Sequence, residues 1–236
     1  MRTTNSLTSL SRRPAFLFDL DGTLVDSVYQ HVLAWRIALE NVGIELSAWR
    51  VHRRIGMSGG LLANELLRET GRPVSAIQAE ELQRVHINEY LRQVSQVRAL
   101  PGARELLRKL TGLDVPWAIA TSGRMDSARP ALDLLAVEPG VNVVTRDEVQ
   151  FAKPDPDLFL AAAERLGVDI ESTVVVGDSV WDLLAARRAG ALGVGLLSGG
   201  TGQGELERAG AYRVYDDPID LLHHLDEVGV RIHATS

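Results

Sequence analysis

The chain has 236 residues, 45% of them hydrophobic and 24% charged, which is the composition of a globular protein that can bury a sizeable core. Its formal net charge of −6 argues against a nucleic-acid partner, and the lack of cysteine excludes disulfides, thiolate metal sites and cysteine nucleophiles. No apolar stretch is long enough to cross a membrane. By default we expect a cytoplasmic protein, monomeric or homodimeric, whose partner is a small molecule.

The first 13 residues are rich in serine and threonine, contain three arginines and lack the apolar segment of a secretory signal. We expect a disordered tail here. A start rich in arginine and serine is also typical of an organelle transit peptide, and this alternative stays open.

The first strand is expected at residues 15–18, where a short apolar run predicts a buried strand. Residues 28–95 then show helical periodicity and no convincing strand. Helices are expected up to a stop at Gly43, around the leucines at 61–67, and after a cap at Ser75. The apolar positions expected to pack in these helices are Val28, Val32, Trp35, Leu39, Val42, Leu61, Leu62, Leu66, Leu67, Ile77, Leu82, Val85 and Leu91.

Beyond about residue 100 the pattern alternates between helix and strand. One of these helices is expected to begin with Asp155 as its cap and Pro156 in its first position. Strands rich in apolar residues that alternate with helices indicate a parallel sheet with helices on both faces. The strands are expected at residues 117–120, 141–144, 173–176, 194–197 and 212–214.

The sequence therefore predicts an α/β protein with a doubly wound, Rossmann-like parallel sheet. Residues 14–26 and 97–236 would form this catalytic core, and residues 27–96 would form an all-helical domain inserted into it. Two connections to the core would let the inserted domain move as a cap over the edge of the sheet.

Polar side chains follow four of the expected strands, where open α/β sheets bind their ligands. Taken singly, each group is also explained as an ordinary turn, loop or helix cap. Neighbouring acids repel each other, and a bound cation would remove that conflict. The four groups, in chain order, are Asp19 with Asp21, then Thr121 with Ser122 and Gly123, then Lys153, and finally Asp178 with Ser179 and Asp182.

Each of these groups has a plausible role in phosphoryl transfer. Asp19, Asp178 and the backbone carbonyl of Asp21 are expected to bind Mg²⁺, which prefers oxygen ligands, with Ser179 and Asp182 one layer further out. Asp19 is the expected nucleophile and Asp21 the general acid and base. The groups expected to bind the phosphate oxygens are Lys153, the Thr121 hydroxyl and the amides of Ser122 and Gly123.

Over residues 15–225 this pattern resembles the haloacid dehalogenase-like hydrolase superfamily, whose four motifs are matched in order. The resemblance implies an aspartate nucleophile and Mg²⁺, in agreement with the roles above. The insertion between the first two motifs is similar to the helical cap of that family, which would exclude water and select the substrate.

Asp21 separates the branches of the superfamily. Dehalogenases and phosphonate-cleaving members lack an acid at this position, and the latter use a cap lysine, whereas residues 27–97 contain none. The β-phosphoglucomutase-like members are closer, because His31 and Trp35 match a histidine and a tryptophan of their first cap helix. His31 would then be a hinge or proton-gating residue, although a histidine with a purely structural role is an open alternative.

Further along the chain, Gly177 stands where such mutases usually carry glutamate, and Asp182 fits the pattern of phosphoglycolate phosphatase-like members. We therefore predict a Mg²⁺-dependent phosphomonoesterase that hydrolyses a small phosphoglycolate- or sugar-phosphate-like ester through an aspartyl-phosphate. A sugar-phosphate mutase is the enzyme alternative. A non-catalytic phospho-switch is a remote one, because receiver domains are shorter and lack the helical insertion.

Substrate selection is expected in the inserted domain. Met57, Ser58 and Gly59 lie in a glycine-rich stretch whose amides could hydrogen-bond a small polar ester. Arg53 or Arg54 could reach a second anionic group, or the pair could simply be a solvated helix face.

Overall fold

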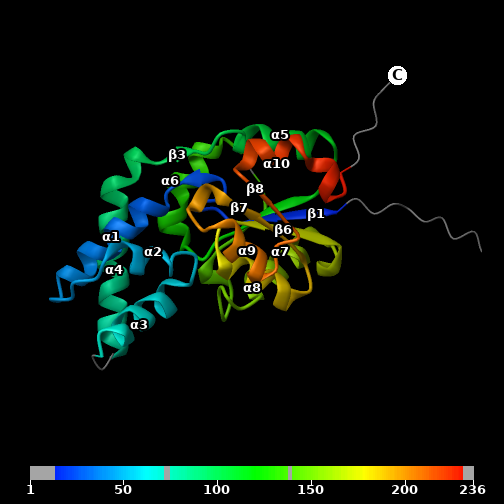
Figure 1. Ribbon diagram of the computed structural model, residues 1–236. Coiled ribbons are helices and arrows are strands. Elements are labelled where there is room, and N and C mark those ends of the chain that lie inside the picture. The colour runs from blue at the N-terminus through cyan, green and yellow to red at the C-terminus, as the bar shows by residue number, and fades with distance from the viewer. Residues whose placement is uncertain (1–13, 72–74, 138–139, 231–236) are drawn as a thin grey trace, which may run out of the picture.

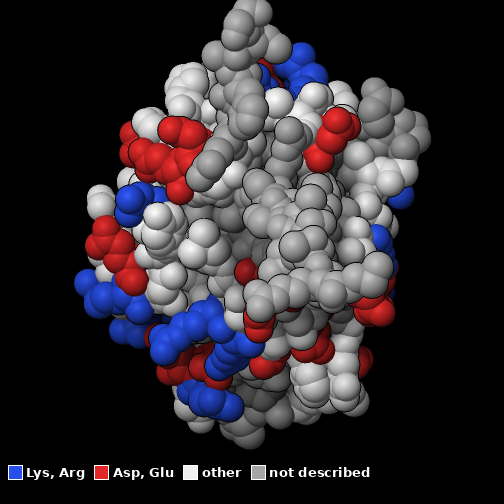
Figure 2. Space-filling model, turned by 90° about the vertical axis from the view of Figure 1, so that its right-hand side faces the viewer, with Lys and Arg blue, Asp and Glu red and all other residues white. Residues whose placement is uncertain are grey.

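The computed structural model describes residues 14–71, 75–137 and 140–230, so the predicted tail at residues 1–13 lies outside the described residues. Figure 1 shows a sheet with helices on both faces and a group of helices beside it. Figure 2 shows acidic and basic side chains close together on the face away from that group. Within the described part of the chain, no helix is long and apolar enough to span a bilayer.

The sheet has six strands in the order β5-β4-β1-β6-β7-β8, and every neighbouring pair is parallel. The order reverses between β1 and β6, which makes this the switch point of a doubly wound sheet. The predicted fold class is confirmed. The strands are β1 (Ala15–Phe18), β4 (Trp117–Ala120), β5 (Val143–Val144), β6 (Thr173–Gly177), β7 (Leu192–Leu196) and β8 (Arg213–Tyr215).

Alternate residues of β1 pack into different layers, because successive side chains of a strand point to opposite faces. Phe16 and Phe18 belong to the cluster under α5, α6 and α10, whereas Leu17 packs with Phe159 beneath α7 and α8. All of these side chains are buried, which explains the uninterrupted apolar run. The helices are α5 (Ala103–Gly112), α6 (Met125–Leu135), α7 (Asp157–Leu166), α8 (Val180–Ala189), α9 (Gln203–Ala209) and α10 (Pro218–His223).

The helices beside the sheet, called here the helical unit, are α1 (Val28–Glu40), α2 (Ala48–His52), α3 (Gly59–Glu69) and α4 (Ala76–Gln93). They enclose an apolar cluster of their own. The capping box between Ser75 and Gln78 starts α4 where the sequence predicted. Two predicted packing positions are wrong: Ile77 is 78% exposed on the outer face of α4, and Val42 lies exposed beyond the end of α1.

A short antiparallel ribbon joins the helical unit to the sheet. It consists of β2 (Val25–Asp26) and β3 (Arg98–Ala99), and the sequence did not predict it. The start of α7 was also misplaced. Asp155 forms an ion pair with Arg188 at 3.3 Å instead of capping the helix, and α7 begins at Asp157, one residue later than predicted.

Candidate active site

The four predicted polar groups lie together at the carboxyl edge of the sheet. Asp19 follows β1, Thr121 follows β4, Lys153 lies in the loop after β5, and Asp178 follows β6. These four strands are consecutive in the sheet, in the order β5-β4-β1-β6, which brings residues more than 100 positions apart into one site.

Lys153 is fully buried between two carboxylates. Its Nζ forms an ion pair with Asp19 Oδ1 and lies 2.8 Å from Asp182 Oδ1. Burial lowers the pKa of a lysine, but the charges of Asp182 and Asp19 outweigh this effect and raise the pKa of Lys153 above its ordinary value. The ammonium is therefore a permanent positive charge in the site.

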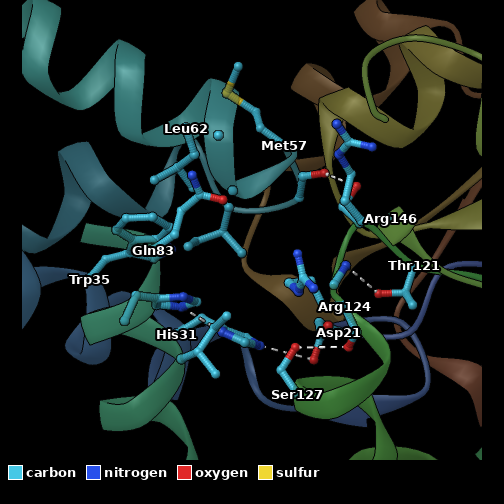
Figure 3. A pocket seen from close by; sticks show the side chains of 18 of the residues that line it. Asp21, His31, Trp35, Met57, Leu62, Gln83, Thr121, Arg124, Ser127 and Arg146 are labelled. Atoms are coloured by element: carbon cyan, nitrogen blue, oxygen red, sulfur yellow. Dashed lines mark hydrogen bonds and ion pairs between the residues drawn. The ribbon is translucent and has the colours of Figure 1, made fainter. Parts of the chain in front are cut away.

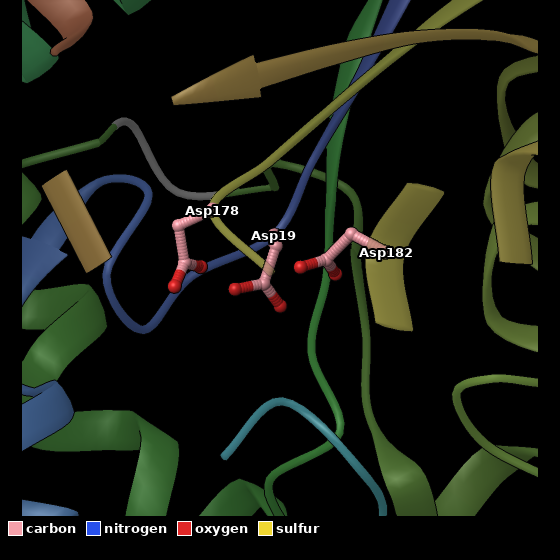
Figure 4. A group of neighbouring side chains, drawn as sticks. All are labelled: Asp19, Asp178 and Asp182. Atoms are coloured by element: carbon pink, nitrogen blue, oxygen red, sulfur yellow. The ribbon is translucent and has the colours of Figure 1, made fainter. Parts of the chain in front are cut away.

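Three buried carboxylates surround this region, and Figure 4 shows them pointing toward one another. Asp19, Asp178 and Asp182 each place one oxygen within 4.8 Å of the others. Burial, opposed by Lys153 and reinforced by Asp182 and Asp21, raises the pKa of Asp19 to about 7. Burial together with the charges of Asp182 and Asp19 raises the pKa of Asp178 well above its ordinary value. When all three carboxylates are ionised, their negative charge exceeds the positive charge of Lys153.

Asp182 is fixed by the first turn of α8. Its Oδ2 accepts hydrogen bonds from the Ser179 amide at 3.1 Å and the Ser179 hydroxyl at 2.5 Å, leaving Oδ1 for Lys153. A Cβ at Gly177 would lie 2.3 Å from the Cβ of Asp182. A glycine at 177 therefore makes room for the acid at 182.

Asp178 packs against two glycines, Gly22 and Gly199, at positions where a side chain would collide with its carboxylate. A Cβ at Gly199 would fall 1.7 Å from Asp178 Oδ2, and one at Gly22 would fall 2.6 Å from the same oxygen. The Thr23 hydroxyl donates to Asp178 Oδ1 at 3.1 Å, and the Ser198 hydroxyl donates to the Gly22 carbonyl at 2.6 Å. Sequence reasoning missed this supporting set, although Thr23 stood in the first motif.

Asp21 is held apart from the acid cluster. Its Oδ1 accepts a hydrogen bond from the Ser27 hydroxyl at 2.6 Å and lies 3.2 Å from His31 Nε2. Burial raises the pKa of this carboxyl, but the charge and hydrogen bond of His31, with the Ser27 hydroxyl, outweigh it and leave the pKa of Asp21 below its ordinary value. The two aspartates of the first motif thus have pKa values shifted in opposite directions.

His31 is itself held by a second histidine that the sequence did not identify. His31 Nδ1 lies 3.1 Å from His86 Nε2, and His31 stacks on the Tyr90 ring with centroids 3.9 Å apart. Trp35 stacks on His86 at 4.2 Å. Burial and the neighbouring His31 lower the pKa of His86 well below its usual range. His31 therefore lies in a ring stack that orients it toward Asp21.

The loop after β4 contacts both the site and the helical unit. The buried Thr121 hydroxyl accepts a hydrogen bond from the Gly123 amide at 3.0 Å. The Ser122 hydroxyl donates to the Gly56 carbonyl at 3.1 Å, and the Ser58 amide donates to the Lys153 carbonyl at 3.2 Å. These bonds fasten residues 56–58 of the helical unit over the site.

A cavity of about 520 Å³ lies between the sheet edge and the helical unit, and Figure 3 shows its interior. Asp19, Asp21 and Thr121 lie on its sheet side, and His31 and Trp35 face them from α1. The other predicted residues that line it are Ser122, Gly123, Met57 and Gly59.

The two predicted arginines do not line this cavity. Arg53 pairs with Glu205 at 2.7 Å on the outside of the molecule, and Arg54 pairs with Glu69 at 3.0 Å within the helical unit. Arg124 and Arg146 line the cavity instead, from the sheet side, and the sequence did not single them out. The positive charges near the cavity therefore come from a different element than predicted.

Comparison with known proteins gives concordant matches. Residues 14–190 match the family described as haloacid dehalogenase-like hydrolase. The chain is 35% identical over 184 residues to hexitol phosphatase A of Escherichia coli strain K12, covering 76% of this chain and 81% of that protein. It is 33% identical over 207 residues to phosphoglycolate phosphatase of Caulobacter vibrioides, covering 86% and 87%. The crystal structure of a hydrolase from Pseudomonas syringae is 55% identical, with a TM-score of 0.90, and covers 92% of this chain and 100% of that one.

Proposed function

The chain belongs to the haloacid dehalogenase-like hydrolases, and from this premise we propose that it is a Mg²⁺-dependent phosphatase of small phosphate esters. One observation carries the proposal. Asp19 is paired with the buried Lys153, while Asp21, two residues later, faces the same cavity with Ser27 and His31 as its partners. Two carboxylates in such different surroundings suit a nucleophile and an acid and base.

The residues of the site fit a magnesium ion. Burial, reinforced by the charges of neighbouring acids, raises the pKa of Asp19 and of Asp178, and a divalent cation would favour their charged forms. These two carboxylates and the Asp21 backbone carbonyl would hold the ion, leaving Asp182 with Lys153. When bound, the ion would shield the attacking carboxylate from the negative phosphate and neutralise charge on the phosphoryl oxygens.

In the proposed reaction the Asp19 carboxylate attacks phosphorus, the bond to the ester oxygen breaks, and Asp21 gives a proton to that oxygen. His31 Nε2 lies where it can supply the proton that Asp21 carries into this first step, after which Asp21 is left as the carboxylate. Water then attacks the phosphorus of the aspartyl-phosphate, Asp21 takes up a proton from it, and inorganic phosphate leaves while Asp19 is restored. The lowered pKa of Asp21 favours the form needed in this second step.

The phosphoryl oxygens would be bound by Lys153, the Thr121 hydroxyl and the amides of Ser122 and Gly123, all at the sheet edge. We further propose that the helical unit, residues 27–96, acts as a cap. Its contacts with Ser122 and Lys153 hold it over the cavity, where it would exclude water and select the leaving group.

The mutase alternative keeps one observation in its favour, since His31 and Trp35 do lie at the cavity. The close approach of Gly177 to Asp182 favours the phosphatase, because a glutamate at 177 would collide with Asp182. A panel of metabolite phosphates with Mg²⁺, including both glucose phosphates, separates the two. We expect inorganic phosphate as the product; interconversion of the glucose phosphates without phosphate release would contradict the proposal.

A further inference from the structure

We infer that the leaving group is a neutral, polyhydroxylated carbon chain or ring, as in hexitol and hexose phosphates, and not a short carboxylate such as glycolate. Gln83 of the helical unit would be a residue that selects it. This inference rests on the proposed phosphatase function and concerns the part of the cavity away from the reacting phosphorus. Three features of that part carry it: its volume, its charge balance and the position of the Gln83 amide.

The cavity is large for a two-carbon ester. Its volume of about 520 Å³ lies within the range of about 300–1,000 Å³ found for pockets that bind drug-sized ligands. Phosphoglycolate would occupy the end next to Asp19 and leave the region under α4 to solvent. A six-carbon ester would reach from the sheet edge to α4, and the apolar side chains of Ile55, Met57 and Leu62 would then contact its carbon skeleton.

The charges around the leaving-group region balance. Arg124 and Arg146 are offset by Glu80 and Asp147, and Arg124 already lies 3.3 Å from Asp147. Arg146 donates to the Val149 carbonyl at 2.7 Å. Among the described residues of the helical unit, none that lines the cavity is lysine or arginine. A second carboxylate there would have as cationic partners, among the lysines and arginines that the structure describes, only these two arginines from the sheet side, which already have other partners, so its desolvation would be unfavourable.

Neutral hydroxyls, in contrast, find both donors and acceptors. Gln83 is partly buried on α4, and its Nε2 donates to the Ala79 carbonyl at 3.2 Å, which orients the side chain. A Cβ at Gly59 would lie 3.2 Å from Gln83 Oε1, so the glycine leaves room for the amide beside the start of α3. Figure 3 shows Gln83 and Trp35 on the side of the cavity opposite Thr121. The amide is thus fixed where it can hydrogen-bond a hydroxyl of a long leaving group.

The test compares sorbitol 6-phosphate, glucose 6-phosphate and phosphoglycolate as substrates, with p-nitrophenyl phosphate as a generic ester. We expect kcat/KM for at least one of the six-carbon esters to exceed that for phosphoglycolate by about 10-fold or more. Gln83→Leu, which keeps the size and removes the amide, should lower kcat/KM for that ester relative to p-nitrophenyl phosphate by about 3- to 10-fold, the value of one hydrogen bond. The matched control is Asn88→Leu, an exposed amide on the same helix, which should leave the ratios unchanged.

Binding of the same three esters to the Asp19→Asn variant is measured by calorimetry. Together with the hydrolysis rates, it distinguishes a failure of the phosphatase proposal from a failure of the inferred leaving-group site. If p-nitrophenyl phosphate is hydrolysed but phosphoglycolate is the preferred substrate or binds more tightly, the inference is overturned and the phosphatase proposal stands. If no ester is hydrolysed and a six-carbon ester still binds more tightly, the phosphatase proposal fails and the inferred site stands. An equal effect of Gln83→Leu and Asn88→Leu would remove Gln83 as the selecting residue.

Discussion

His31 Nε2 lies 3.2 Å from Asp21 Oδ1, so a side chain on the first helix of the helical unit contacts the acid that follows the first strand of the sheet. The same oxygen accepts the Ser27 hydroxyl from the turn between them. The position of the helical unit and the protonation of Asp21 are therefore linked through the hydrogen bond between His31 and Asp21.

Replacement of His31 should change the pH dependence of the reaction. In His31→Gln the charge that holds down the pKa of Asp21 is lost, so that pKa rises and the carboxylate form is reached only at higher pH. We expect the acidic limb of the rate of aspartyl-phosphate breakdown, the step that needs the Asp21 carboxylate, to move to higher pH, with a loss of about 10-fold or more in that rate at neutral pH. The exposed His223 on α10 provides the control His223→Asn, whose profile should match the wild type. An unshifted profile in His31→Gln would exclude the link.

Replacement of Asp21, the general acid and base, should slow both the formation and the hydrolysis of the aspartyl-phosphate. Asp21→Asn keeps the shape and a hydrogen bond with Ser27 but cannot exchange a proton. We expect a loss of about 10²- to 10⁴-fold in kcat for p-nitrophenyl phosphate at unchanged circular dichroism. A normal rate would show that the proton travels by another route.

Gly199 should be intolerant of a side chain. Because a Cβ there would lie 1.7 Å from Asp178 Oδ2, Gly199→Ala must displace either the loop or the carboxylate. We expect weaker Mg²⁺ binding by about 10-fold or more in calorimetry, since a misplaced ligand is costly. Gly112→Ala is the matched control, because no atom lies within 4 Å of the added Cβ at the end of α5. Equal Mg²⁺ affinity in the two variants would argue against Asp178 as a ligand.

Stability of the metal-free protein should depend on Asp19. Its folded pKa of about 7 lies above the ordinary value of 3.8, so its contribution is complete at low pH and is lost as the pH rises through about 7. His86, with a lowered pKa, acts in the opposite sense below its ordinary 6.5. Because His86 is present in both proteins, its contribution cancels, and the difference between wild type and Asp19→Asn in urea unfolding should change between pH 3.8 and about 7. Mg²⁺ should restore the stability lost by the wild type, and a pH-independent difference would contradict the assignment.

The sheet edge was predictable from the sequence because short apolar runs and the polar residues after them are local signals. Parallel strands bring their carboxyl ends to one edge, so Asp19, Thr121 and Asp178 could be placed together without a structure. Lys153 could be predicted as a site residue because it follows the expected third strand, in the order of the four polar groups. Its ion pair with Asp182 could not be predicted, because it depends on the first turn of α8.

The cavity walls were less predictable, because they depend on packing between distant segments. Arg53 is close in sequence to residues that line the cavity. Its side chain nevertheless bonds to Glu205, 152 residues away, on the outside of the molecule. His86 and Gln83 sit on a helix whose apolar pattern is weak, with only Ala79, Leu82 and Tyr90 buried. Nothing in their local sequence indicates that the helix crosses over the site.

The central claim is that Asp19 is the nucleophile, and acid quenching tests it most directly. The enzyme is mixed with a radiolabelled aryl phosphate and Mg²⁺, quenched during turnover, and digested for peptide mapping. We predict acid-stable label on the peptide that carries Asp19, and neither label nor turnover in Asp19→Asn. Label on a different peptide, or turnover by Asp19→Asn at the wild-type rate, would contradict the account.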